Sequence, residues 1–188
     1  MNATTSTVSS QPSSQTLSHH SENREAMGRK QIEREIIINA SIHEVWSIFT
    51  NDTLLPEWAP VVNDVTCTVS GDGVGTVRSC GVTMAGQAGK MVERCVELIP
   101  ETRVSYLVDD ETFGFRKMFD GYGFTVNFVP VGSGQTKLVM ETFYTPHNLF
   151  FVVLNTLVVR RKTRKLVVDL LDGLKRYVET PSGHQIGS

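Results

Sequence analysis

One amphipathic stretch near the end of the chain, residues 148–178, reads NLFFVVLNTLVVRRKTRKLVVDLLDGLKRYV and decides the fold. In its second half Leu166, Leu170 and Leu174 recur every four residues, which is the spacing of one apolar face of a helix. Residues 149–154 are apolar on nearly every side. We therefore predict a single long helix that either is covered by the rest of the chain or itself covers it.

Six short runs with β-strand character precede this helix. They span residues 61–70, 75–84, 90–99, 103–108, 117–129 and 137–145. Short turns containing Gly and Pro separate them, and this spacing favours an antiparallel meander. Gly114, Gly121 and Gly123 are expected to help a long strand in this region to bend.

The chain before the meander predicts one strand and two short helices. Residues 31–39 are rich in isoleucine and indicate a strand. Ser41 and Glu44 have the spacing of a helix capping box, and apolar residues follow at helical intervals up to Phe49. Residues 52–58 indicate a second short helix, with Pro56 tolerated only in its first turn.

This order of elements predicts an α+β fold. A curved antiparallel sheet of about six or seven strands would wrap around the long C-terminal helix, and the two short helices after strand 1 would close one end. A strongly curved sheet and a helix cannot touch along their whole length. The space between them is either filled by large side chains or left as an apolar pocket, and we expect a pocket that takes a small hydrophobic molecule.

Length and composition limit the alternatives. The 188 residues suffice for one domain, predicted at residues 29–180, with a disordered polar tail at 1–28 and a shorter tail at 181–188. The net charge of -2 does not indicate a basic surface that would bind nucleic acid. Cys67, Cys80 and Cys95 cannot all pair, so reduced core thiols and a cytoplasmic location are expected. The first residues carry no apolar signal-peptide region.

The glycine-rich segment GDGVGTVR at residues 71–78 runs into a strand rather than a helix, which excludes a phosphate-binding loop. This segment, the later residues 92–94, the turn at Pro100 and the pair Ser105-Tyr106 resemble the START-like (helix-grip, SRPBCC) superfamily, in its polyketide cyclase/dehydrase and lipid-transport branch. The resemblance covers about residues 31–179. It implies an internal hydrophobic cavity but no single activity, because such proteins include lipid carriers, hormone receptors and cyclases.

The candidate site residues depend on strand register, because a shift of one residue turns every side chain to the other face. Arg78 facing inward would polarise a ligand carbonyl or hold a carboxylate; facing outward it would be solvated. Glu141 faces inward if Val139 and Phe143 do, and outward if Met140 and its neighbours do. The catalytic candidates are Arg78, Glu141 and Tyr122. The predicted ligand-binding set is Trp58, Arg78, Glu93, Tyr106, Tyr122, Phe124, Glu141, Phe143, Phe150 and Leu154.

Three functions remain open at this point. The preferred hypothesis is binding of a polyketide-, lipid- or sterol-like molecule without a reaction. A polyketide cyclase, aromatase or dehydratase would instead use inward polar groups. A lipid or quinone carrier would use the basic run at residues 160–165 at a membrane surface, although such runs are more often solvated helix faces. No metal-ligand spacing is present, so no metal and no cofactor are predicted, and the oligomeric state stays open.

Overall fold

The computed structural model describes residues 26–68 and 73–180. The tail predictions for residues 1–25 and 181–188, and the part of the glycine-rich turn at residues 71–72, lie outside the described residues. The described chain begins with a short segment before β1 (Lys30–Ile38). In this segment the Gly28 amide donates a hydrogen bond to the Gly121 carbonyl at 2.9 Å.

The described strands form one antiparallel sheet of seven strands in the order β1-β7-β6-β5-β4-β3-β2. The strands after β1 are β2 (Val62–Thr68), β3 (Val77–Met84), β4 (Gln87–Ile99), β5 (Arg103–Glu111), β6 (Phe119–Val131) and β7 (Gln135–Pro146). β2 to β7 form the predicted meander, and β1 joins its far edge beside β7. The predicted fold class is therefore confirmed.

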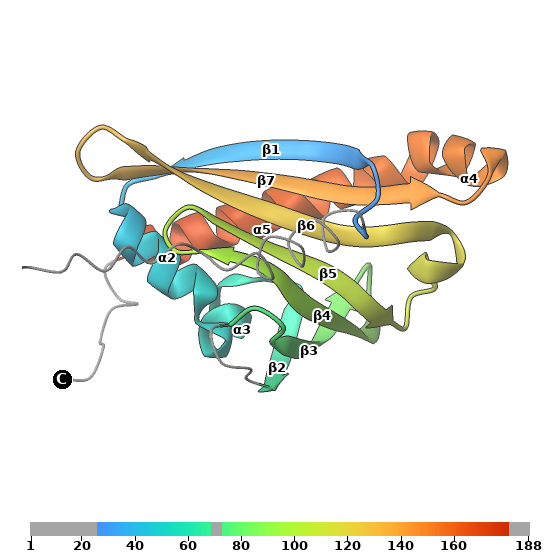
Figure 1. Ribbon diagram of the computed structural model, residues 1–188, viewed down its shortest axis with the longest axis horizontal. Coiled ribbons are helices and arrows are strands. Elements are labelled where there is room, and N and C mark those ends of the chain that lie inside the picture. Colours follow the sequence, from blue (N-terminus) through green and yellow to red (C-terminus); the bar gives the residue numbers. More distant parts are fainter. Residues whose placement is uncertain (1–25, 69–72, 181–188) are drawn as a thin grey trace, which may run out of the picture.

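The helices lie where the sequence predicted them. α2 (Ile42–Thr50) begins at Ser41, whose hydroxyl accepts a hydrogen bond from the Glu44 amide at 3.3 Å. A single 3₁₀ turn (Asp52–Leu54) leads into α3 (Leu55–Trp58), with Pro56 in its first turn. Figure 1 shows α2 and α3 at one end of the curved sheet and the long C-terminal helix lying along one of its faces.

The C-terminal helix is continuous but has three parts. α4 (Leu149–Leu154) is followed by a π-helical turn (Asn155–Val159) and then by α5 (Arg160–Glu179). The π turn inserts one extra residue, which rotates α5 by about 100° relative to α4. At this turn Asn155 is buried and accepts a hydrogen bond from the Tyr144 hydroxyl at 2.8 Å. A buried hydrogen bond between β7 and the helix therefore lies at the point where the helical register changes.

The core lies between α5 and the concave face of the sheet. Val167, Leu171 and Leu174 on α5 are almost fully buried. They share one hydrophobic cluster with inward side chains of the sheet and of α2 and α3. The first, apolar part of the C-terminal helix was expected to be covered or to cover the sheet. Instead, α4 extends beyond the sheet, and most of its apolar side chains are exposed.

The bend of the sheet uses a bulge in β6. The register of β6 against β7 shifts between Asp120 and Gly123. Gly121, within this bulge, has a positive φ of 59°, and a side chain there would overlap the backbone at Gly28. Glycine is therefore required where the strand bends and the incoming chain crosses it.

Candidate functional site

A cavity of about 90 Å³ lies between α5 and the concave face of the sheet. Its walls are mainly large aliphatic and aromatic side chains that come from the helices and the sheet. They include Phe49, Leu55, Trp58, Val82, Met84, Met91, Tyr122, Phe124, Met140, Leu166, Val167, Leu170, Leu171 and Leu174. The cavity is thus apolar and is formed by elements from both ends of the described chain.

The cavity is small for a ligand site. Its 90 Å³ correspond to the liquid volume of about three water molecules. Drug-sized ligands occupy about 300–1,000 Å³. Three methionines, Met84, Met91 and Met140, belong to the wall. Methionine has a flexible, unbranched side chain that repacks easily, so the wall contains groups that can move to widen the space.

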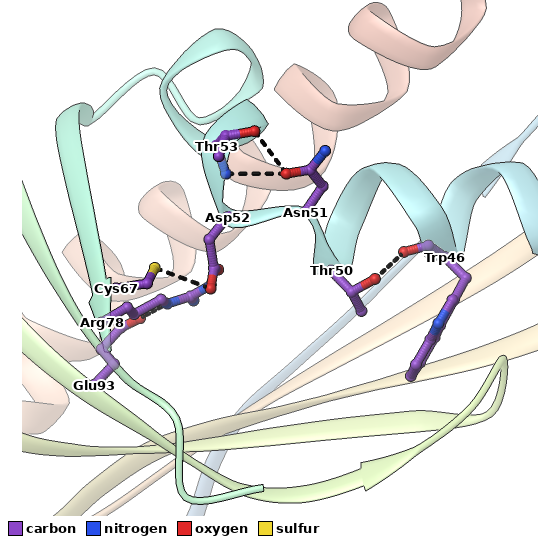
Figure 2. Close-up of polar contacts among 8 residues, drawn as sticks. All are labelled: Trp46, Thr50, Asn51, Asp52, Thr53, Cys67, Arg78 and Glu93. Atoms are coloured by element: carbon purple, nitrogen blue, oxygen red, sulfur yellow. Dashed lines mark hydrogen bonds and ion pairs between the residues drawn. The ribbon is translucent and has the colours of Figure 1, made fainter. Parts of the chain in front are cut away.

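One wall carries a buried charged cluster. Arg78 on β3 is only 4% exposed and donates from Nε to Glu93 Oε2 at 2.7 Å. It also donates from Nη1 to Asp52 Oδ1 at 2.8 Å, and its guanidinium carbon lies 3.9 Å from the centre of the Tyr106 ring. Figure 2 shows how Asp52, from the turn before α3, reaches across to this arginine, with the Cys67 thiol beside it.

Local geometry explains this cluster. Arg78 and Glu93 are direct partners in the antiparallel pairing of β3 and β4, so their side chains share the concave face. Asp52 follows Asn51, whose side-chain oxygen accepts hydrogen bonds from Thr53 and turns the chain after α2. The strand pair and the turn therefore deliver three charges to one point inside the protein.

The electrostatics of the cluster are set by burial and by these neighbours. Burial alone would lower the pKa of Arg78, but the nearby carboxylates of Glu93 and Asp52 raise it well above its ordinary value. Burial also raises the pKa of the Tyr106 and Tyr122 phenols, so both stay protonated at neutral pH. The cluster contains one guanidinium group and two carboxyl groups. The cluster has no surplus positive charge for an anionic ligand.

Two residues of the cavity lining each have a buried polar atom without a hydrogen-bond partner among the described residues. These atoms are Nε1 of Trp58 and Oγ1 of Thr142. A buried donor or acceptor without a partner costs about 1–3 kcal/mol. A polar group of a ligand, or water, that reached either atom would be stabilised by it.

The profile of one protein family, described as "Polyketide cyclase / dehydrase and lipid transport", matches residues 29–179. The chain belongs to this family. No match to the chain was found among curated protein sequences. The family assignment therefore rests on the profile match, which covers nearly the whole of the described chain.

Solved structures share the fold of this family member. A START superfamily protein from Mycobacterium smegmatis has a TM-score of 0.65 at 16% identity, covering 80% of this chain and 97% of that one. Norcoclaurine synthase from Thalictrum flavum has a TM-score of 0.63 at 19% identity, covering 79% and 92%. The Zhui aromatase/cyclase from Streptomyces sp. R1128 has a TM-score of 0.60 at 17% identity, covering 81% and 96%. These identities show the common fold alone.

Six of the ten ligand-binding residues predicted from the sequence lie at the cavity. Trp58, Arg78, Glu93, Tyr122 and Phe124 line the cavity, and Tyr106 lies directly under the Arg78 guanidinium. The open question of register is thereby answered for β3: Arg78 points inward.

The other four predicted residues lie elsewhere. Met140 and Thr142 take the inward positions of β7, so Glu141 and Phe143 belong to the opposite face. Glu141 there accepts a hydrogen bond from Lys30 at 3.0 Å. Phe150 is 70% exposed on α4, and Leu154 is half-buried; neither belongs to the cavity wall. The expectation failed for Phe150 and Leu154 because α4 extends past the sheet instead of lying across it.

Several residues of the site were not found from the sequence. Asp52 looked like an ordinary residue at a helix start, and its ion pair joins positions 26 residues apart. Thr142 carried no signal beyond its place in a strand. Cys67, expected in the core, is instead exposed on β2, and its thiol donates to Asp52 at 3.2 Å. Thr142 and Asp52 have side chains that can bind a polar group, but their spacing in the sequence did not indicate that they belong to this site.

A second, more open hollow of about 350 Å³ lies beside Trp58, which lines both spaces. Its other walls are Glu57, Pro60, Gly173, Arg176, Tyr177 and Thr180. A side chain at position 173 would overlap the carbonyl oxygen of Trp58. The glycine thus lets α5 approach α3 closely enough to hold Trp58 between the two hollows.

Proposed function

We propose that this protein binds a small, largely apolar molecule in the cavity between α5 and the sheet. The single observation that carries the proposal is an apolar cavity lined by two residues, Trp58 and Thr142, that each have a buried polar atom without a partner among the described residues. Buried polar groups in native proteins are nearly always paired, so two such atoms on residues that line one cavity favour a ligand or water that reaches them. The family description, which names polyketide cyclases and lipid transport, agrees with this class of ligand.

The charged groups in the cavity wall limit the class of ligand that can bind. Arg78 already has two carboxylate partners, so a neutral hydroxyl or carbonyl group suits the cluster better than a carboxylate. An engineered cavity of about 150 Å³ holds one benzene molecule. Even a single aromatic ring would therefore need the methionines of the wall to move. We expect binding to be accompanied by widening of the cavity.

Two measurements test this proposal. Native mass spectrometry of the freshly purified protein should show a co-purifying mass. Thermal-shift titration with 1-naphthol and 1-naphthoate then compares a neutral and an anionic probe with the same ring system, and naphthol should stabilise the protein more. A preference for naphthoate, or no bound mass and no stabilisation by either probe, would remove the proposal.

A matched pair of variants gives the sign of the electrostatic effect. Glu93→Gln removes one negative charge from the cluster, so it should bring naphthoate binding closer to naphthol binding. Glu141→Gln makes the same chemical change on the opposite face and should leave the preference unchanged. Equal effects of the two variants would contradict a role for the cluster in ligand choice.

A second candidate function is acid–base chemistry on the bound molecule. It is favoured by the position of Glu93, a carboxylate in the cavity wall that is held by Arg78 and lies on the same concave surface as the protonated phenol of Tyr122. In such an arrangement Glu93 would take a proton next to a carbonyl, and Arg78 and Tyr122 would stabilise the enolate. Cyclisation of a poly-β-ketone, followed by its aromatic absorbance, should then be lost in Glu93→Gln and kept in Glu141→Gln.

A further inference from the structure

The outer side of the C-terminal helix carries an unusual concentration of exposed apolar side chains. The apolar patch consists of Leu149, Phe150, Val152, Val153, Leu157 and Val158, all at least 40% exposed. Leu149 and Phe150 are 78% and 70% exposed, although apolar side chains of this size are normally covered. Figure 1 shows that this part of the helix, around α4, lies at the end of the sheet opposite α2 and α3.

A basic turn follows the apolar patch directly. Residues 160–165 contain five cations, Arg160, Arg161, Lys162, Arg164 and Lys165, and all five are exposed. The sequence has no acidic residue between Leu149 and Val168. Lys165 forms an ion pair with Asp169 at the far end of the turn. Apolar and positively charged side chains therefore adjoin on one helix without local neutralisation of most of the charge.

We propose that the apolar patch and the basic turn together dock onto the surface of a membrane that contains anionic phospholipid. A helix of this kind lies in the plane of the interface, with apolar side chains among the acyl chains and cations at the headgroups. The two features cover residues 149–165, or about 25 Å of helix at 1.5 Å per residue. No helix of the described chain is long and apolar enough to cross a membrane.

Other occupants fit this surface less well. A second copy packed through the same face would cover the apolar side chains but supply no negative charge to the basic turn, because the sequence has no acidic residue between Leu149 and Val168. Residues 1–25 contain two acidic residues and one arginine, and residues 181–188 contain none of either sign. Neither end of the chain supplies the negative charge that five cations would attract. An anionic lipid surface supplies both the charge and the apolar phase.

The position of the surface also connects it with the cavity. Thr163 lies between Lys162 and Arg164 in the sequence, but its side chain is buried and lines the cavity. One turn of the helix thus presents cations outward and a cavity wall inward. Docking would place the lipid surface against the back of the helix that closes the cavity.

Vesicle co-sedimentation of the full chain tests the proposal directly. Wild-type protein should sediment with vesicles of phosphatidylcholine and phosphatidylglycerol at about 50 mM salt, much less at about 500 mM salt, and not with pure phosphatidylcholine vesicles. Each cation near the surface contributes about fivefold in affinity. Absence of sedimentation with the anionic vesicles at low salt would overturn the proposal, whatever the result of the ligand experiments.

Matched variants separate the docking face from general charge and hydrophobicity. Arg161→Glu/Lys162→Glu should lower binding at least about tenfold, whereas Lys90→Glu/Arg176→Glu changes the net charge equally at exposed sites away from the patch and should not. Phe150→Ser should weaken binding, and Ile37→Ser, at an exposed strand position, should not. Equal losses in the control variants would contradict the assignment of this face.

A fluorescence measurement guards against loss of binding through misfolding. Phe150→Trp keeps an apolar side chain within the proposed contact. Brominated lipid should quench this variant more strongly than wild type, which contains only Trp46 and Trp58. Equal quenching, or a dimer in wild type that Phe150→Ser converts to a monomer, would show that lipid is not the occupant.

Discussion

Replacing Arg78 by methionine should be among the most damaging single changes in the interior. The side chain of Arg78 is 5% exposed, and those of Glu93 and Asp52 are 10% and 18% exposed. Arg78→Met keeps the volume but leaves two carboxylates without their cation. Breaking a buried ion pair from one side costs about 3–5 kcal/mol, because the remaining charge stays desolvated. Loss of the contact with the Tyr106 ring adds to this cost.

The effect is measurable by chemical and thermal denaturation at pH 7. In a domain of this size about 1 kcal/mol corresponds to about 2–4 °C in Tm, so the expected decrease is roughly 6–20 °C. Glu93→Gln alone should cost less, because Arg78 keeps Asp52 as a partner.

The triple variant Arg78→Met/Glu93→Gln/Asp52→Asn decides whether charge is the cause. It removes all three charges and should recover a large part of the lost stability, since neutral replacement of a buried ion pair is often tolerated. A loss below about 1 kcal/mol in Arg78→Met would mean that these carboxylates are solvated rather than buried. A triple variant as unstable as the single one would show that packing, and not unpaired charge, explains the effect.

Three further predictions concern stability and thiol chemistry. Gly173→Ala should destabilise the protein, by about 1–3 kcal/mol in urea unfolding, because its methyl group overlaps the Trp58 carbonyl; a gain, as helix propensity alone predicts, would contradict the close approach. Partial desolvation and the hydrogen bond to Asp52 raise the pKa of Cys67 to about 11, although the residue is exposed, so alkylation by iodoacetamide should accelerate about tenfold per pH unit up to pH 11, and Asp52→Asn should react faster at any given pH. The same raised pKa contributes stability below pH 9, its ordinary value, and this contribution is lost as the pH rises through 11. Tyr144→Phe should cost about 1–3 kcal/mol by leaving its buried amide partner in the π turn unpaired, and thermal melting that matches wild type would show that water replaces the hydroxyl.

The elements of the fold were predictable because their signals are local. The capping residue Ser41, the helix-initiating Asn148 and the glycine turns act within a few residues of themselves. The four-residue repeat of leucine indicated the side of α5 that faces the sheet, where Leu174 is fully buried. The order of these elements, with their lengths, left few ways to bury the apolar faces.

The face on which each strand side chain lies was harder to predict. β4 shifts its register against β5 between Val92 and Glu93 and again between Cys95 and Glu97. Bulges of this kind leave no clear trace in apolar alternation, yet each one exchanges the inner and outer faces. Glu141 on β7 was ambiguous for another reason, because apolar residues lie on both faces of that strand, and only Glu93 points into the cavity.

The linear order of residues was enough to define a curved antiparallel sheet closed by a C-terminal helix, because caps, turns and apolar periodicity are properties of neighbouring residues. Three-dimensional packing was needed to bring Asp52 to Arg78, to turn Glu141 outward and to leave α4 uncovered. These outcomes depend on contacts between distant segments and on the π turn that rotates the last helix, and such contacts form only when the whole chain has folded.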